Sequence, residues 1–197
     1  MNKVFLAIGI LIFSTISLVA NAQNKVIFGG FSFGSILPKD TITNTIFKEN
    51  GGVLFINKLL VEKTKEISNE SFLIDFNLLK DDASEEDQNI IVLALDNEYI
   101  NSVSIPGDKL TRTDIILNFQ IIFFNAKNNF LTASIPLEIS KNISSVDKLN
   151  NSQIKSELKK MYESEVLKYY YELLNNFTLK SKFKNRIGIT EVNFEDN

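Results

Sequence analysis

The sequence predicts an α+β fold, with a mainly antiparallel sheet of about five to seven strands and helices packed on one face of it. Residues 114–124 and 131–139 alternate apolar and polar side chains with the period of two that a half-buried strand requires. Residues 53–67 and 152–176 instead repeat apolar residues at helical spacing. The apolar fraction of 44% is ordinary for a globular protein and too high for a disordered one.

The first 22 residues are typical of a cleavable signal peptide. Lys3 precedes an apolar run that ends in Ala20-Asn21-Ala22, with small residues at the two positions that a signal peptidase requires. The run is a little short for a membrane anchor, which is the alternative interpretation. We therefore expect export, cleavage after Ala22, and a mature protein of residues 23–197 that forms a single α+β domain in the periplasm or outside the cell.

The N-terminal part of the mature chain predicts a strand followed by two helices. Residues 25–34 combine β-branched and aromatic residues with three glycines, which indicates a strand whose backbone bends or approaches a neighbour closely. Asp40 can cap a helix over residues 41–49, and Gly51-Gly52 should interrupt it. The longer helix over residues 53–67 then follows.

A second group of segments predicts more of the sheet. Residues 71–79 alternate as a strand with one buried face, whereas the acidic residues 80–88 indicate a solvated loop or the start of a helix. Residues 90–95 are apolar on both faces, which is typical of an interior strand but also of a buried helix. Asp96-Asn97 can then turn the chain into another strand over residues 98–105.

The two most regular strands form a predicted antiparallel hairpin. Residues 114–124 and 131–139 each present an uninterrupted apolar face, and a short Asn-rich turn connects them. Pro136 has no amide hydrogen, so we expect it at a sheet edge or at a bulge. The helix over residues 152–176 follows, and a last strand over residues 187–194 should complete the sheet.

The absence of both histidine and cysteine restricts the chemistry of this chain. It excludes Ser-His-Asp and Cys-His catalysis, zinc sites built on these residues, and disulfides. The net charge of −3 argues against nucleic-acid binding. We expect no cofactor, and binding rather than catalysis.

Two segments are candidate interaction surfaces. The first is Tyr169-Tyr170-Tyr171. Successive helical residues point about 100° apart, so the three rings cannot all enter one core face, and an exposed ring suits an interface. The second is a basic stretch that, as a strand, would direct its charges to one face and meet an anionic partner such as a lipid headgroup or an acidic glycan. It consists of Lys180, Lys182, Lys184 and Arg186. For each segment the alternative is an ordinary solvated surface.

These features favour a non-catalytic, exported envelope or secreted protein of bacterial type that binds a protein partner or a cell-surface component. Peripheral membrane contact is compatible with this function. One alternative is a carboxylate-dependent hydrolase of glycans or phosphoesters, which requires two acidic groups to converge. The candidate carboxylates are Asp75, Asp96, Glu98 and Asp114. A second alternative is a carrier of a small apolar ligand, because the sheet is rich in phenylalanine.

Overall fold

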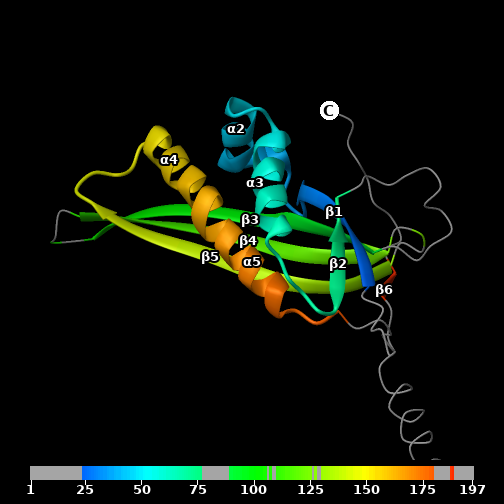
Figure 1. The fold of residues 1–197 in the computed structure, drawn as a ribbon. Coiled ribbons are helices and arrows are strands. Elements are labelled where there is room, and N and C mark those ends of the chain that lie inside the picture. The colour runs from blue at the N-terminus through cyan, green and yellow to red at the C-terminus, as the bar shows by residue number, and fades with distance from the viewer. Residues whose placement is uncertain are drawn as a thin grey trace, which may run out of the picture.

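The computed structural model describes residues 24–76, 89–105, 107, 110–125, 127 and 130–179, together with the backbone of residues 187–188. These residues form a sheet with strand order β2-β1-β3-β4-β5-β6 and a layer of helices over one face (Figure 1). The predicted signal peptide, residues 1–22, lies outside the described residues, so cleavage after Ala22 stays a prediction.

Twelve elements follow one another along the described part of the chain. The strands are β1 (Asn24–Phe33), β2 (Phe72–Asp75), β3 (Asn89–Ile105), β4 (Leu110–Asn125), β5 (Phe130–Ser145) and the two-residue β6 (Ile187–Gly188). The helical elements are η1 (Pro38–Asp40), α2 (Ile42–Glu49), α3 (Val53–Lys65), α4 (Asn151–Met161), the π-helical turn η3 (Tyr162–Val166) and α5 (Leu167–Asn176).

The sheet is mixed, so the expectation of a mainly antiparallel sheet was wrong. β1 pairs in parallel with both β2 and β3, whereas β3, β4 and β5 pair antiparallel with their neighbours. The physical reason is the long connection from β1 to β2. Its helices α2 and α3 return the chain to the end of the sheet at which β1 begins, so β2 runs in the same direction as β1. The α+β class and the helical layer on one face are confirmed (Figure 1).

β3 is a single long strand at the point where the sequence suggested a turn. Residues 90–95, for which strand and helix were both open, belong to this strand. Leu95 pairs with Phe119 and Asn97 pairs with Asn118, so Asp96 is the extra residue of a β-bulge. The chain therefore bends at the bulge and continues in the same ladder with β4.

The predicted hairpin of residues 114–124 and 131–139 is confirmed and extends further in both directions as β4 and β5. Pro136 pairs with Gln120 of β4 on one side. Among the described residues, β6 pairs only with Phe130 and Leu131 on the other side. As far as these residues show, Pro136 lies on an open part of the β5 edge, which suits its missing amide hydrogen.

Local residues explain both the break between α2 and α3 and the point at which α2 begins. Gly51 and Gly52 separate the two helices with φ angles of 101° and 75°, which favour glycine. Thr41, rather than the predicted Asp40, is the N-cap of α2, and its Oγ1 accepts a hydrogen bond from the Asn44 backbone N–H at 3.0 Å. Asp40 instead ends the short helix η1.

A glycine in β1 permits close contact between the strand and α3. Gly30 has a φ of 83°, and a Cβ at this position would lie 2.7 Å from Asn57 Oδ1. The same Asn57 oxygen accepts a hydrogen bond from the Phe31 backbone N–H at 2.8 Å. The predicted role of a glycine in this strand, close backbone approach, is therefore confirmed at Gly30.

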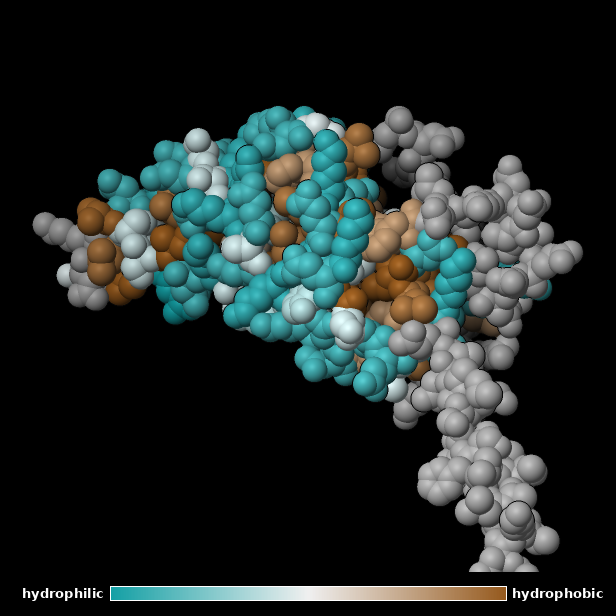
Figure 2. Space-filling model, in the orientation of Figure 1, coloured by the Kyte–Doolittle hydropathy of each residue, from teal (hydrophilic) through white to brown (hydrophobic). Residues whose placement is uncertain are grey.

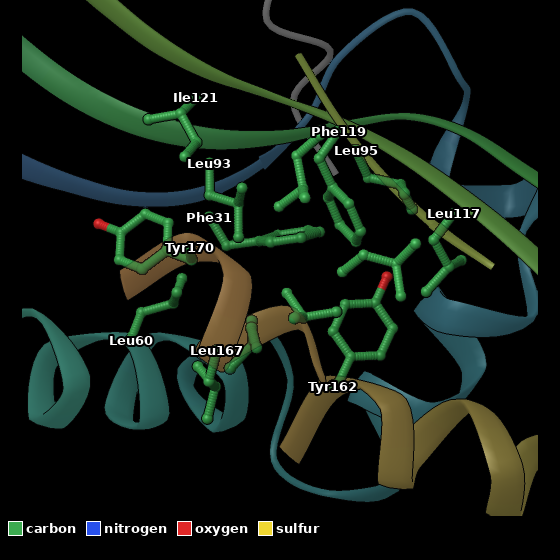
Figure 3. Close-up of a cluster of buried hydrophobic side chains, with 14 of the residues drawn as sticks. Phe31, Leu60, Leu93, Leu95, Leu117, Phe119, Ile121, Tyr162, Leu167 and Tyr170 are labelled. Carbon is green, nitrogen blue, oxygen red and sulfur yellow. The ribbon is translucent and has the colours of Figure 1, made fainter. Parts of the chain in front are cut away.

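The core lies between the helices and the facing side of the sheet (Figure 3). Tyr162 is fully buried and packs edge-on against three phenylalanine rings. Its ring centroid lies 6.4 Å from Phe31, 5.2 Å from Phe47 and 5.9 Å from Phe119. Such near-perpendicular arrangements are favoured because the positive edge of one ring meets the negative face of another. β1, α2, β4 and the π-helical turn are thereby packed onto one another.

The predicted helix over residues 152–176 contains a π-helical turn, η3, that the spacing alone did not indicate. Its buried side chains recur every four residues, and each such step turns about 40° beyond a full α-helical turn. The buried stripe would therefore rotate away from the sheet, and the extra residue of a π-turn sets part of that rotation back. The members of the stripe are Ile154, Leu158, Tyr162, Val166, Tyr170 and Leu174.

Candidate functional site

The three consecutive tyrosines of α5 have different environments. Tyr170 points into the core with 1% exposure, and its hydroxyl accepts a hydrogen bond from Thr64 Oγ1 at 3.2 Å. Burial raises the pKa of Tyr170, and the hydrogen bond from Thr64 partly opposes this shift. Tyr169 is 42% exposed, and Tyr171 is partly buried. Tyr169 and Tyr171 therefore lie on opposite flanks of the exposed side of the helix.

Lysine side chains accompany both outer tyrosines. Lys63 of α3 places its Nζ 4.5 Å from the centroid of the Tyr171 ring, and Lys168 places its Nζ 5.4 Å from that of Tyr169. These distances are within the range of cation–π attraction. Lys63 also forms an ion pair with Glu66 at 2.5 Å. We call Tyr169, Tyr171, Lys63 and Lys168 the tyrosine–lysine surface.

A polar cavity of about 560 Å³ lies at the C-terminal end of α5. Asn69 forms part of its wall, where its Nδ2 donates hydrogen bonds to the backbone oxygens of Leu174 at 2.6 Å and Phe177 at 2.7 Å. These bonds satisfy carbonyl groups that a helix end leaves free. The cavity is lined by Asn24, Ser68, Asn69, Glu70, Ser71, Asn175, Asn176, Phe177, Thr178 and Leu179. Asn175 is one helical turn beyond Tyr171, so the cavity lies next to that flank of the tyrosine–lysine surface.

The predicted basic surface cannot be placed. Lys180, Lys182, Lys184 and Arg186 lie outside the described residues. Of the predicted strand over residues 187–194, residues 187–188 are described, and they pair with β5. The basic stretch stays a prediction.

The four candidate carboxylates lie in separate local environments. Asp75 of β2 forms an ion pair with Lys25 at 2.8 Å, and Asp114 of β4 forms one with Arg112 at 2.7 Å. A Cβ on residue 34 would clash with the carboxylate of Asp96, which lies at the bulge of β3. The fourth, Glu98, binds the start of α2.

Glu98 acts as a cap for α2 from a distant strand. Its carboxylate oxygens accept hydrogen bonds from the backbone N–H groups of Ile42 at 2.6 Å and Thr43 at 3.0 Å. A negative charge at a helix N-terminus is stabilised by these free donors and by the helix dipole. Glu98 is paired with Leu117, which faces the core, so its side chain lies on the helical side of the sheet.

The structure does not gather these carboxylates into one cleft. Asp114 is one residue out of phase with the core-facing Ile115 and Leu117, so it lies on the sheet face opposite Glu98. Asp75 lies on the edge strand β2, near the end of β3 that is remote from both. Within the described residues, no group of three or more acidic side chains is placed to hold a metal ion. Asp75, Glu98 and Asp114 therefore do not form with one another the acid–base pair that glycoside hydrolysis needs.

Apolar side chains fill the space between the helices and the sheet in the described residues (Figure 3). The largest are Tyr162, Tyr170, Phe47, Phe72, Phe119 and Phe123, each less than or about 2% exposed. A carrier of a small apolar ligand requires an apolar cavity. The hollow at the C-terminal end of α5 is lined mainly by polar residues instead.

Sequence reasoning missed the two polar pairs that join the helices inside the core. The hydroxyls of Tyr162 and Thr43 lie 2.9 Å apart, and Thr64 binds Tyr170. The four-residue repeat that contains both tyrosines was the available signal for their burial. No sequence signal links either tyrosine to its threonine, because the partners are more than 100 residues apart.

No protein-family model matches the sequence, and no curated protein matches it. Several solved structures are similar to the chain at low identity, among them the following three. A hypothetical protein, CT253, from Chlamydia trachomatis is 6% identical, with a TM-score of 0.43 over 79% of this chain and 99% of that one. A putative neuraminyllactose-binding hemagglutinin homolog from Helicobacter pylori is 10% identical, with a TM-score of 0.41 over 79% and 87%. A minor lipoprotein from Acinetobacter baumannii is 11% identical, with a TM-score of 0.40 over 78% and 91%.

Among the helices of the described residues, none is long and apolar enough to cross a bilayer.

Proposed function

We propose that this chain is an exported, non-catalytic envelope or secreted protein that binds a protein partner or a cell-surface component through the tyrosine–lysine surface. The observation that carries the proposal is the exposure of Tyr169 beside the buried Tyr170. A buried neighbour fixes the helix, so the outer aromatic rings are held in place before binding. Rigid aromatic side chains offer large contact areas at a low cost in conformational entropy, and they are enriched at interfaces.

Three further features support a binding function. The candidate carboxylates are engaged in ion pairs, a bulge and a helix cap rather than converging on one point. Residues 1–22 predict export, and outside the cytoplasm a binding surface would meet envelope components. The polar cavity beside Tyr171 adds amide, hydroxyl and carboxylate groups that can donate or accept hydrogen bonds to such a component.

The experiment compares the wild-type protein with the double variant Tyr169→Ala/Tyr171→Ala as bait for solubilised envelope material, with bound molecules quantified by mass spectrometry. Tyr170 is left unchanged because its removal would damage the core. We expect the double variant to retain its fold and to lose a component that the wild type captures. Leu54→Ala, which changes a 68% exposed residue on α3, is the matched control and should capture as the wild type does. Equal recovery by the wild type and the double variant would contradict the proposal.

A further inference from the structure

Within the part of the chain that the structure describes, the outer edge of β3 is open beyond the bulge. β1 pairs with β3 only as far as Leu95, and Gly34 and Ser35 form the last hydrogen bonds on this side, to Leu95 and Asp96. From Tyr99 to Ile105, β3 pairs with β4 on its inner side, and no other described strand pairs with its outer side. An open edge leaves a row of backbone N–H and C=O groups that a further strand can bind.

The other edges of the same sheet carry features that discourage strand addition. β5 has Pro136, which cannot donate a ladder hydrogen bond, and the charged Glu138 and Lys141. β2 is four residues long and carries the ion pair between Lys25 of β1 and its own Asp75. Natural sheets protect their edges by such means. The segment from Tyr99 to Ile105 contains no proline and no charged residue.

Two large apolar side chains are exposed on this open strand. Tyr99 is 48% exposed and Val103 is 52% exposed. They are four residues apart in a strand, so they lie on the same face, with Asn101 between them. The hydrophobic side chains at the end of the sheet that extends beyond α4 are visible in Figure 2.

We propose that the open edge of β3 pairs with the same edge of a second copy of this chain, antiparallel and centred on Asn101. In this register Tyr99 of each chain lies opposite Val103 of the other, and the two Asn101 side chains face each other across the two-fold axis. Aromatic and β-branched side chains are favourable cross-strand pairs. A two-fold axis makes one surface serve both chains, and the uncharged segment brings no like charges together. The result is one continuous sheet across the dimer.

A second copy fits this edge better than an unrelated strand because the segment is complementary to itself. When the strand of the second copy runs in the opposite direction about Asn101, its Val103 lies opposite Tyr99 and its Tyr99 lies opposite Val103. The side-chain amide of Asn101 then lies opposite the same amide of the second copy. Glu98, the nearest charged residue, falls opposite Ser104 and is already bound to the start of α2. The exposed apolar positions, the central Asn101 and the nearest charged residue thus receive compatible partners in the same register.

Single cysteines test the register, because the natural chain contains none. Opposite residues of an antiparallel pair have Cβ atoms about 4.5–5.5 Å apart, near the separation that a disulfide needs. We expect Asn101→Cys to form a disulfide-linked dimer under mild oxidation. Asn142→Cys is the matched control, since Asn101 and Asn142 flank the same Asp114 on its two sides. Asn142 lies on the β5 edge and should not cross-link. Equal cross-linking of the two variants, or cross-linking of Asn142→Cys alone, would overturn the proposal.

Light scattering after size-exclusion chromatography tests the dimer without a cross-link. The wild type should have twice the mass of one chain. Asn101→Asp places two carboxylates face to face at the axis and should raise the dissociation constant by at least about tenfold. Asn142→Asp adds the same charge beside the same Asp114 and should leave the mass unchanged. Circular dichroism confirms that each variant is folded. A wild type that stays monomeric at high micromolar concentration, or equal effects of the two substitutions, would overturn the proposal.

Discussion

Two tyrosine hydroxyls inside the core illustrate what single residues contribute. Tyr162 pairs with Thr43 of α2, and Tyr170 pairs with Thr64 of α3. A buried hydroxyl without a partner costs free energy, so each pair permits a large ring to be buried together with its polar end. The two rings are among the largest fully buried side chains, and their hydroxyl pairs fix which helices lie against them.

The substitution Tyr162→Phe should lower the free energy of unfolding by about 1–2 kcal/mol. It removes one hydrogen bond and leaves the fully buried Thr43 hydroxyl without this partner. Urea unfolding followed by circular dichroism measures the change. The substitution Thr43→Val should then lower the free energy of unfolding less in the Tyr162→Phe variant than in the wild type. Strictly additive effects would show that the two hydroxyls do not interact.

Stability should fall as the pH rises above about 10, the ordinary pKa of tyrosine. Burial raises the pKa of Tyr162 and Tyr170 in the folded state, each shift being partly opposed by the threonine hydrogen bond. The unfolded chain therefore loses these protons first, and ionisation favours unfolding. Urea titrations measure the free energy of unfolding of the wild type and of the double variant Tyr162→Phe/Tyr170→Phe. The difference between the two should shrink as the pH rises from about 9 to about 11. A difference independent of pH would contradict this assignment.

Among the elements, α2 depends on a strand that lies far away in the sequence. Glu98 binds the first backbone N–H groups of the helix, so β3 positions α2 over the sheet. We predict that Glu98→Ala lowers the free energy of unfolding by about 2 kcal/mol, since two charge-assisted hydrogen bonds are lost. Glu138→Ala, at an exposed position on β5, should change it little. Equal effects in chemical denaturation would rule out the capping role.

The π-helical turn η3 can be tested by removing its extra residue. Deletion of the exposed Glu163 should convert the turn to α-helix, because a π-turn is an α-helical turn with one residue added. The missing residue and the lost π-turn nearly cancel in rotation, so Tyr170 and Leu174 should stay in the core. Deletion of the exposed Lys168 instead removes a residue from regular α-helix, rotates the rest of α5 by about 100°, and should cost several kcal/mol of unfolding free energy. Thermal unfolding measures both changes, and equal losses in the two deletion variants would contradict this role of η3.

The sequence was sufficient to predict the positions of most elements, because the period of buried side chains differs between strands and helices. It could not give the parallel pairing of β1 with β2 and β3, since a parallel strand and an antiparallel strand can show the same alternation. The bulge at Asp96 was mistaken for a turn because Asp-Asn suits both. The three tyrosines were rightly expected to differ in direction, but which ring enters the core depends on the packing of α5.

At the scale of the whole molecule, the two proposals concern different regions. The tyrosine–lysine surface lies on α3 and α5, whereas the open edge of β3 lies where the sheet extends beyond α4 (Figure 1). Tyr169→Ala/Tyr171→Ala should therefore leave the dimer intact, and Asn101→Asp should leave the tyrosine–lysine surface intact. Light scattering on the first variant and the capture experiment on the second check this independence. Loss of both properties in either variant would point to unfolding instead.

The most direct test of the proposed function is photo-crosslinking in living cells of the native host, with a benzophenone amino acid at position 169 of the full chain. We predict a crosslinked adduct with an envelope component, recovered from the envelope or the medium. The chain in the adduct should begin at Gln23 when its N-terminus is sequenced by mass spectrometry. A chain that keeps residues 1–22 in the cytosol, or an exported chain that gives no adduct from position 169, would contradict the account.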